Sequence, residues 1–197
     1  MIPAVLIRTV PETTTVEVEA WWDKAKALHP RWQWCTYRDP IDPEGFPRTA
    51  PHWDRCRTGA QRAGLIRLES LLRHGGIYID SDVELYRPLE PLLALRAFAA
   101  WEDPGVIPDA VIGAEPHHRA IVDALEVAIA RIDEGPWESG PGATTTVFAN
   151  RPDVLVLPPG TFYPYHYTEK AERRSEAHHA MPWCFGAHHW AGSWLSA

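Results

Sequence analysis

This 197-residue chain has only three cysteines, no long apolar run and no surplus of basic residues. Cys35, Cys56 and Cys184 are odd in number and show no Cys-x-x-Cys spacing, so we expect reduced thiols, as in a cytoplasmic protein. No segment approaches the ~18 consecutive apolar residues that a membrane helix needs. The opening segment, residues 1–8, lacks the charged flank of a signal peptide. We therefore predict neither a membrane span nor a secretory leader.

The charge balance argues against a general nucleic-acid partner. Lys and Arg number 19 against 26 Asp and Glu, a net charge of −7, whereas a nucleic-acid binder usually shows a basic face. A hydrophobic fraction of 45% and a charged fraction of 23% are those of an ordinary globular protein. The length predicts a single domain over residues 1–197, large enough for one sizeable core.

Apolar periodicity and chain-breaking residues predict an α/β domain. Strand-like runs cover residues 4–7, 32–37, 77–79, 97–101, 110–114 and 154–157. Helical spacing covers residues 16–28, 58–74 and 117–132, with loops at 39–51 and 137–142 and a loop or short helix at 88–95. A strand–helix–strand opening indicates a Rossmann-like, mostly parallel or mixed central sheet flanked by helices.

Two carboxylates follow the apolar strand predicted at residues 77–79. Asp80 and Asp82 come after a Gly-Gly break and that short run, at the strand end where open α/β sheets bind their ligands. In a strand, residues i and i+2 point to the same side, and no basic residue follows before Arg87. The two charges would repel each other unless a cation lay between them. Oxygen ligands suit Mg²⁺ or Mn²⁺, which commonly also bind phosphate oxygens. An Asp-x-Asp pair can also be only a solvated turn.

The segment from Ile66 to Asp82 resembles the signature of the DXD-containing glycosyltransferases. Its approximate pattern is Ser-Asp-(apolar)₂-Arg-x₃-Leu-x₃-Gly-Gly-(apolar)-Tyr-(apolar)-Asp-x-Asp. This family includes initiating mannosyltransferases, capsular-polysaccharide transferases and, more distantly, clostridial glucosylating toxins. The resemblance implies a single catalytic domain with the GT-A fold, a nucleotide-sugar donor and transfer of a sugar with retention of anomeric configuration.

The resemblance also implies roles for individual residues. Asp82 would bind Mn²⁺ or Mg²⁺, and Asp80 would reach sugar or ribose hydroxyls and the ion through water. Asp109 stands where the family often has Asn, near the donor sugar, and is counted with Asp80 and Asp82 as catalytic. The residues implied to bind the donor are Arg67, Tyr78, Asp80, Ser81, Ser193 and Trp194.

The C-terminal His-His-Trp-Ala-Gly-Ser-Trp segment resembles the element that closes the family's sequences. His188 or His189 would supply an imidazole to the same cation, and the Trp194 indole N–H would donate to a phosphate or glycosidic oxygen. Neighbours in a strand point in opposite directions, so only one histidine is expected to face the metal. The alternative is an ordinary strand that carries surface histidines.

Two positions depart from the family pattern. Gly64 stands where the family has an Asp that contacts the nucleoside, and Ile7 replaces a histidine. The donor base therefore stays open between UDP and GDP sugars, and the acceptor is unknown. Ser139-Gly140-Pro141 matches a family element, and Phe162-Tyr163-Pro164 matches another that we interpret as structural.

We therefore predict a metal-dependent glycosyltransferase, with a hexosyltransferase as the expected type. Two alternatives belong to other classes. One is a non-catalytic relative that binds nucleotide sugars or carbohydrate, which the departures at Gly64 and Ile7 favour. The other is a metal-dependent phosphohydrolase, which would need a nucleophilic or third acidic motif that the sequence does not show.

Overall fold

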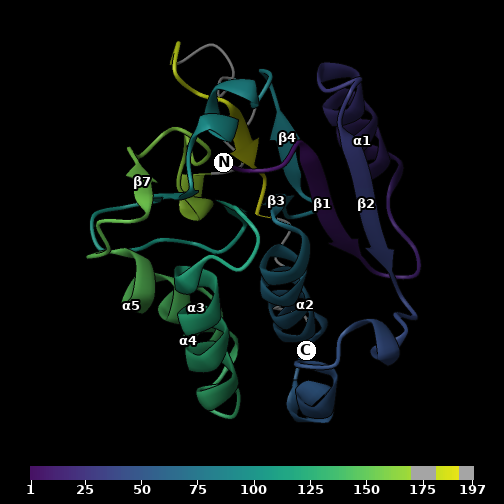
Figure 1. The fold of residues 1–197 in the computed structure, drawn as a ribbon. Helices are drawn as coiled ribbons and strands as arrows, with labels where there is room; N and C mark the ends of the chain where they lie inside the picture. The colour runs from purple at the N-terminus through teal and green to yellow at the C-terminus, as the bar shows by residue number, and fades with distance from the viewer. Residues whose placement is uncertain (170–180, 191–197) are drawn as a thin grey trace.

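The computed structural model describes residues 1–169 and 181–190 (Figure 1). The strands are β1 (Val5–Val10), β2 (Gln33–Arg38), β3 (Gly76–Ile79), β4 (Val83–Leu85), β5 (Ala97–Ala100), β6 (Val111–Ala114), β7 (Leu155–Leu157) and β8 (Gly186–His188). The α-helices are α1 (Val16–Leu28), α2 (Gly59–His74), α3 (Arg119–Ala130), α4 (Pro136–Ser139) and α5 (Pro141–Phe148). Short 3-10 helices are η1 (Pro43–Gly45), η2 (Ala50–Arg55), η3 (Glu90–Ala94) and η4 (Tyr167–Glu169).

Six strands form one mixed sheet in the order β2-β1-β3-β6-β5-β7. β1 pairs in parallel with β2 and β3, and β5 pairs in parallel with β7. β6 lies antiparallel between β3 and β5. β4 and β8 form a separate antiparallel ribbon. The predicted fold class, a mostly parallel or mixed sheet flanked by helices, is confirmed.

The sheet is buried on both faces because its side chains alternate between two cores. Tyr78 and Ile7 point into the core under α2, α3 and α5, whereas Ile77, Ile79 and Leu6 point into the core that α1 closes. Figure 1 shows α2 to α5 gathered on one side of the molecule and α1 beside β1 and β2 on the other. The result is the three-layer arrangement expected when helices cover both faces of a sheet.

Helix α2 begins and ends where the sequence predicts. The Thr58 side chain accepts from the backbone N–H of Gln61 and so caps the first turn. At the other end, Gly75 has a φ of +63° and Gly76 a φ of +113°, a region that favours glycine. The Gly-Gly pair therefore lets the chain leave α2 and enter β3 directly.

Two predictions need correction. Residues 137–142, predicted as a loop, lie in α4 and the start of α5. Pro136 and Pro141 stand in the first turns of these helices, where proline is well tolerated. The ribbon strand β4 was also missed, since three residues are too few to show periodicity. Across the described residues, no helix combines the length and the apolar character needed to cross a bilayer.

Candidate functional site

Acidic residues from three neighbouring strands meet at one edge of the sheet. Asp80 directly follows β3, Asp109 lies just before β6, and Glu102 lies just after β5. Because β6 is antiparallel to both neighbours, its amino end lies beside the carboxyl ends of β3 and β5. Open α/β sheets bind their ligands at this edge.

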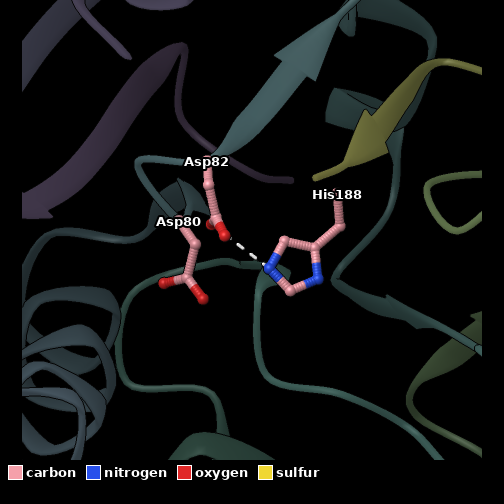
Figure 2. Close-up of side chains that lie close together, drawn as sticks. All are labelled: Asp80, Asp82 and His188. Carbon is pink, nitrogen blue, oxygen red and sulfur yellow. Dashed lines mark ion pairs between the residues drawn. The ribbon is translucent and has the colours of Figure 1, made fainter. Parts of the chain in front are cut away.

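Asp80, Asp82 and His188 form a candidate metal centre at this edge. One potential ligand atom from each lies within 4.8 Å of the other two. The Nε2 atom of His188 is 3.2 Å from Oδ1 of Asp82. Figure 2 shows the imidazole and the Asp82 carboxylate directed at each other, with the Asp80 carboxylate beside them. Two carboxylates and an imidazole are a donor set that suits Mn²⁺ or Mg²⁺.

The short ribbon brings His188 to the carboxylates. β8 pairs with β4 so that His188 lies opposite Val83, the residue after Asp82. The backbone N–H of His188 donates to the carbonyl of Phe162 at 3.0 Å, and that of His189 donates to the carbonyl of Asp82 at 2.8 Å. Backbone hydrogen bonds thus hold the tail segment against the Asp-x-Asp turn.

The two tail histidines have different environments. His189 lies on the α1 side: its Nδ1 is 2.7 Å from the Tyr165 hydroxyl and its Nε2 is 3.1 Å from a Glu84 oxygen. Its ring stacks on Trp21, with centroids 4.4 Å apart. Of the two histidines predicted as alternative ligands, only His188 belongs to the metal cluster.

The carboxylates have a basic partner that is distant in sequence, the predicted donor-site residue Arg67. Arg67 of α2 is 3% exposed and forms ion pairs with Asp80, through Nη2, and with Asp109, through Nη1. Arg67 was predicted to bind the donor, but the sequence did not show that its guanidinium pairs with these two aspartates. Arg67 thereby fixes the two carboxylates relative to each other.

The side chain of Tyr78 contacts both Arg67 and Asp80 in this ion-pair network. The side chain is fully buried, and its ring lies 4.4 Å from the Arg67 guanidinium carbon. Its hydroxyl donates to Oδ1 of Asp80 at 3.0 Å and is 2.6 Å from the Thr9 hydroxyl. Tyr78 was predicted as a donor-binding residue, and in the structure its buried side chain contacts Asp80.

The charges of the centre are strongly coupled. Burial raises the pKa of Asp80; Arg67 opposes this, and the nearby charges of Asp82 and Asp109 add to it. Burial by itself would lower the pKa of His188, but Asp82, Asp80 and Glu102 together raise it above its usual value. The Nδ1 atom of His188 is buried without a hydrogen-bond partner in residues 1–169 and 181–190. His188 is thus an imidazole whose surroundings favour a positive charge at its Nε2 side.

The other positions singled out in the sequence lie outside the candidate metal centre or outside the described residues. Ser81 lies in the half-buried turn between β3 and β4. Ser193 and Trp194 lie outside the described residues. A Cβ at Gly64 would lie 3.7 Å from Oδ2 of Asp109, so this departure from the family pattern borders the Arg67–Asp109 pair. Ile7 is simply a core residue.

A second polar group at the same edge had no sequence signal. Glu102, Asp103 and His166 bring three potential ligand atoms within 4.8 Å of one another. Tyr163, interpreted from the sequence as structural, is 3% exposed. Burial raises the pKa of its hydroxyl, and the charges of Asp109, Asp80 and Glu102 raise it further. No motif joins these residues along the chain, and only the sheet topology brings them together.

The part of the chain that carries most of the candidate site matches a known protein family. Residues 16–99, from α1 into β5, match the family described as "Glycosyltransferase sugar-binding region containing DXD motif". The matched region includes Arg67, Tyr78, Asp80 and Asp82. The resemblance predicted from the sequence is confirmed.

Curated relatives are mannosyltransferases. The chain is 29% identical over 126 residues to inositol phosphoceramide mannosyltransferase 2 of Schizosaccharomyces pombe, covering 60% of this chain and 36% of that protein. It is 28% identical over 134 residues to mannosyl phosphorylinositol ceramide synthase SUR1 of Saccharomyces cerevisiae, covering 64% of this chain and 34% of that protein. The chain thus spans about a third of the length of the curated relatives it matches.

Solved structures confirm the fold. A glycosyltransferase involved in glycosylation of the major capsid of PBCV-1 matches with a TM-score of 0.55 at 16% identity, covering 98% of this chain and 97% of that one. The galactosyltransferase LgtC in complex with donor and acceptor sugar analogs matches with a TM-score of 0.53 at 11% identity, covering 95% and 87%. The chain has the GT-A fold of these enzymes.

Proposed function

From the DXD-motif region in residues 16–99, we propose that this chain is a metal-dependent glycosyltransferase. The observation that carries the proposal is the convergence of Asp80, Asp82 and His188, whose ligand atoms lie within 4.8 Å of one another at the ligand-binding edge of the sheet. The donor would be a UDP or GDP sugar, and the curated mannosyltransferases make GDP-mannose the first donor to test. The acceptor is a glycan, a protein or a small molecule.

The residues fit a divalent cation. Asp82 and His188 already face each other, and Asp80 adds a second carboxylate, so these three side chains would hold Mn²⁺ or Mg²⁺. When bound, such an ion neutralises the charge that develops on a departing nucleoside diphosphate. Arg67 keeps Asp80 and Asp109 oriented toward the site through its two ion pairs. Because those carboxylates are prearranged, they need little reorganisation when a donor binds.

Three aspartates at the proposed donor site are engaged in ion pairs. Arg67 binds Asp80 and Asp109, and His188 binds Asp82. The family resemblance implies transfer with retention. Because we identify no nucleophile among these aspartates, we assign attack from the face from which the leaving group departs. The cytoplasmic location stays a prediction, to which three unpaired cysteines lend support.

The test is nucleotide-sugar turnover with GDP-mannose, UDP-glucose and UDP-galactose, with Mn²⁺ or with EDTA. We expect sugar release that needs the metal and that falls at least about 100-fold in Asp82→Asn, since loss of even a partner behind a metal ligand costs about 10- to 100-fold. Asp23→Asn, an exposed substitution on α1, is the matched control and should keep full turnover.

The same assay separates the alternative classes. A phosphohydrolase would cleave the pyrophosphate bond, giving a nucleoside monophosphate and a sugar 1-phosphate, and would leave the bond between sugar and phosphate intact. A non-catalytic relative would bind nucleotide sugar and Mn²⁺ without any product. Either result in the wild type would refute the proposed activity, and metal-independent transfer would refute the role of Asp80, Asp82 and His188.

A further inference from the structure

The proposed metal centre leaves two polar groups unused at the same sheet edge. Glu102 follows β5, and Tyr163 lies in the segment after β7; these two strands run parallel. Asp109, before β6, lies on the side of the metal centre. The polar groups therefore extend from Asp80 across β6 toward β5.

The Tyr163 hydroxyl is a buried donor without a partner. The residue is 3% exposed, and the hydroxyl has no hydrogen bond to any part of the chain that the structure describes. Its ring meets His188 edge-on, with centroids 6.0 Å apart and an angle of 84° between the planes. Burial and then the charges of Asp109, Asp80 and Glu102 raise the pKa of Tyr163, so the proton stays on the oxygen at neutral pH.

Glu102 is the matching acceptor. Its side chain is 9% exposed, and its carboxylate forms a long ion pair with the imidazole of His166. The Nε2 atom of His166 lies 3.6 Å from Oε1 of Glu102 and 3.6 Å from Oδ2 of Asp103, beyond hydrogen-bond distance. The Glu102 backbone N–H donates to the carbonyl of Val106 at 3.0 Å, which fixes the position of the residue.

The buried, unpaired hydroxyl of Tyr163 is costly to the fold, and at functional sites a ligand commonly satisfies such a group. A hydroxyl group can both donate and accept. A hexose ring carries hydroxyls on adjacent carbons, so it can accept from Tyr163 while donating to Glu102. Asp109 binds Arg67 through Oδ2, which leaves Oδ1 for a further sugar hydroxyl.

We propose that Tyr163 and Glu102, with Asp109, form a subsite for the hydroxyl groups of the transferred sugar, and that Tyr163 helps to select that sugar. The inference rests on the proposed function, because it places the nucleotide sugar beside Asp80, Asp82 and His188. In this arrangement, the diphosphate of the donor lies at the metal centre and does not contact Tyr163 or Glu102. Variants here should therefore change the affinity for the sugar and leave that for the nucleoside diphosphate unchanged.

The experiment compares each nucleotide sugar with its nucleoside diphosphate by isothermal titration calorimetry in Mn²⁺. The probes are GDP with GDP-mannose and UDP with UDP-glucose. For the preferred donor, we expect Tyr163→Phe to reduce the preference for the sugar-bearing form by about 3- to 10-fold, the range of one lost hydrogen bond. Nucleoside diphosphate affinity should stay within about twofold, and Glu102→Gln should act in the same way.

Tyr165→Phe is the matched control, because that buried hydroxyl already bonds to Nδ1 of His189 at 2.7 Å. It should lower the melting temperature and leave the sugar preference unchanged. Tyr163→Phe should instead reduce the sugar preference. Its melting temperature should be unchanged or higher, since the substitution removes an unpaired hydroxyl from the interior. A merely structural Tyr163 would not produce that combination.

Three results would overturn the inference. Tyr163→Phe could keep the full preference for the sugar-bearing form, or the wild type could bind both forms equally while still binding the nucleoside diphosphate. A second Mn²⁺ that is lost in Glu102→Gln would assign Glu102, Asp103 and His166 to a metal instead. If the wild type binds neither form with Mn²⁺, the proposed function itself fails, which is a distinct outcome.

Discussion

The Nε2 atom of His188 lies 3.2 Å from Oδ1 of Asp82, although the two residues are far apart in the sequence. The pairing of β4 with β8 enforces this contact, because it places His188 opposite the residue that follows Asp82. The neighbouring His189 makes its contacts on the α1 side of the ribbon. Function and stability are thus assigned to adjacent histidines.

We expect His188→Ala to weaken Mn²⁺ binding at least about 10-fold, because it removes one of three protein ligands. His189→Ala should keep Mn²⁺ binding but lower the free energy of unfolding by about 1–3 kcal/mol, since it removes the hydrogen bonds of His189 to the Tyr165 hydroxyl and to Glu84. Calorimetric Mn²⁺ titration and denaturant unfolding measure the two effects. Equal loss of Mn²⁺ affinity in both variants would contradict this division.

Gly64→Asp is expected to destabilise the site, and Asp109→Asn is expected to compensate. A Cβ at position 64 would lie 3.7 Å from Oδ2 of Asp109 and 3.9 Å from Nη1 of Arg67, so a new carboxylate would repel Asp109 and compete for the guanidinium. In the double variant, the new Asp replaces the lost charge beside Arg67. A double-mutant cycle of unfolding free energies should show favourable coupling of about 0.5–3 kcal/mol.

Gly59→Asp is the control for this cycle. It adds the same charge to the same helix, at an exposed position where a Cβ would meet nothing within 4 Å. It should couple with Asp109→Asn by no more than experimental error. Additive effects in the Gly64 and Asp109 pair would show that the two positions do not share Arg67.

Gly76→Ala should cost stability before it affects activity. Gly76 has a φ of +113°, and a Cβ there would lie 2.7 Å from the carbonyl oxygen of Val5 on the adjacent strand. The backbone strain alone is worth about 1–3 kcal/mol, and the clash adds to it. Gly45→Ala, where a Cβ has open space, should melt close to the wild type. A wild-type melting temperature for Gly76→Ala would contradict the described entry into β3.

Glu19 should contribute to the loss of unfolding free energy at acidic pH. Hydrogen bonds from Thr14, Arg8 and Arg38 lower the pKa of Glu19 from 4.5 to about 2. Because the folded-state value is the lower one, the stabilisation is present above pH 4.5 and is lost as the pH falls toward about 2. Glu19→Gln should therefore lose less unfolding free energy over that range, by about 1 kcal/mol or less, since the carboxylate is partly exposed.

Urea unfolding at a series of acidic pH values measures this effect. Glu44→Gln changes an exposed glutamate that has no ion pair among the described residues, and it is expected to leave the acid limb as in the wild type. A Glu19→Gln curve parallel to that of the wild type would contradict the assignment.

Much of the fold is visible in local patterns. The threonine cap of α2, the glycines that end it and the apolar run of β3 each act over a few neighbouring residues, so the sequence predicts them almost at their observed bounds. The position of Asp80 and Asp82 at a strand end follows from the same signals. Residues 71–86 and the tail motif therefore predict Asp80 and Asp82 as candidate metal ligands, together with one of the two tail histidines.

Tertiary structure decided what those residues touch. Strand order places Asp109 and Glu102 beside Asp80, the path of α2 directs Arg67 to two carboxylates, and the β4–β8 ribbon selects His188 over His189. Periodicity cannot report such contacts, because it records only which face of an element is buried. The partner of a charged side chain depends on where distant elements pack, and the energy of a buried charge depends on that partner.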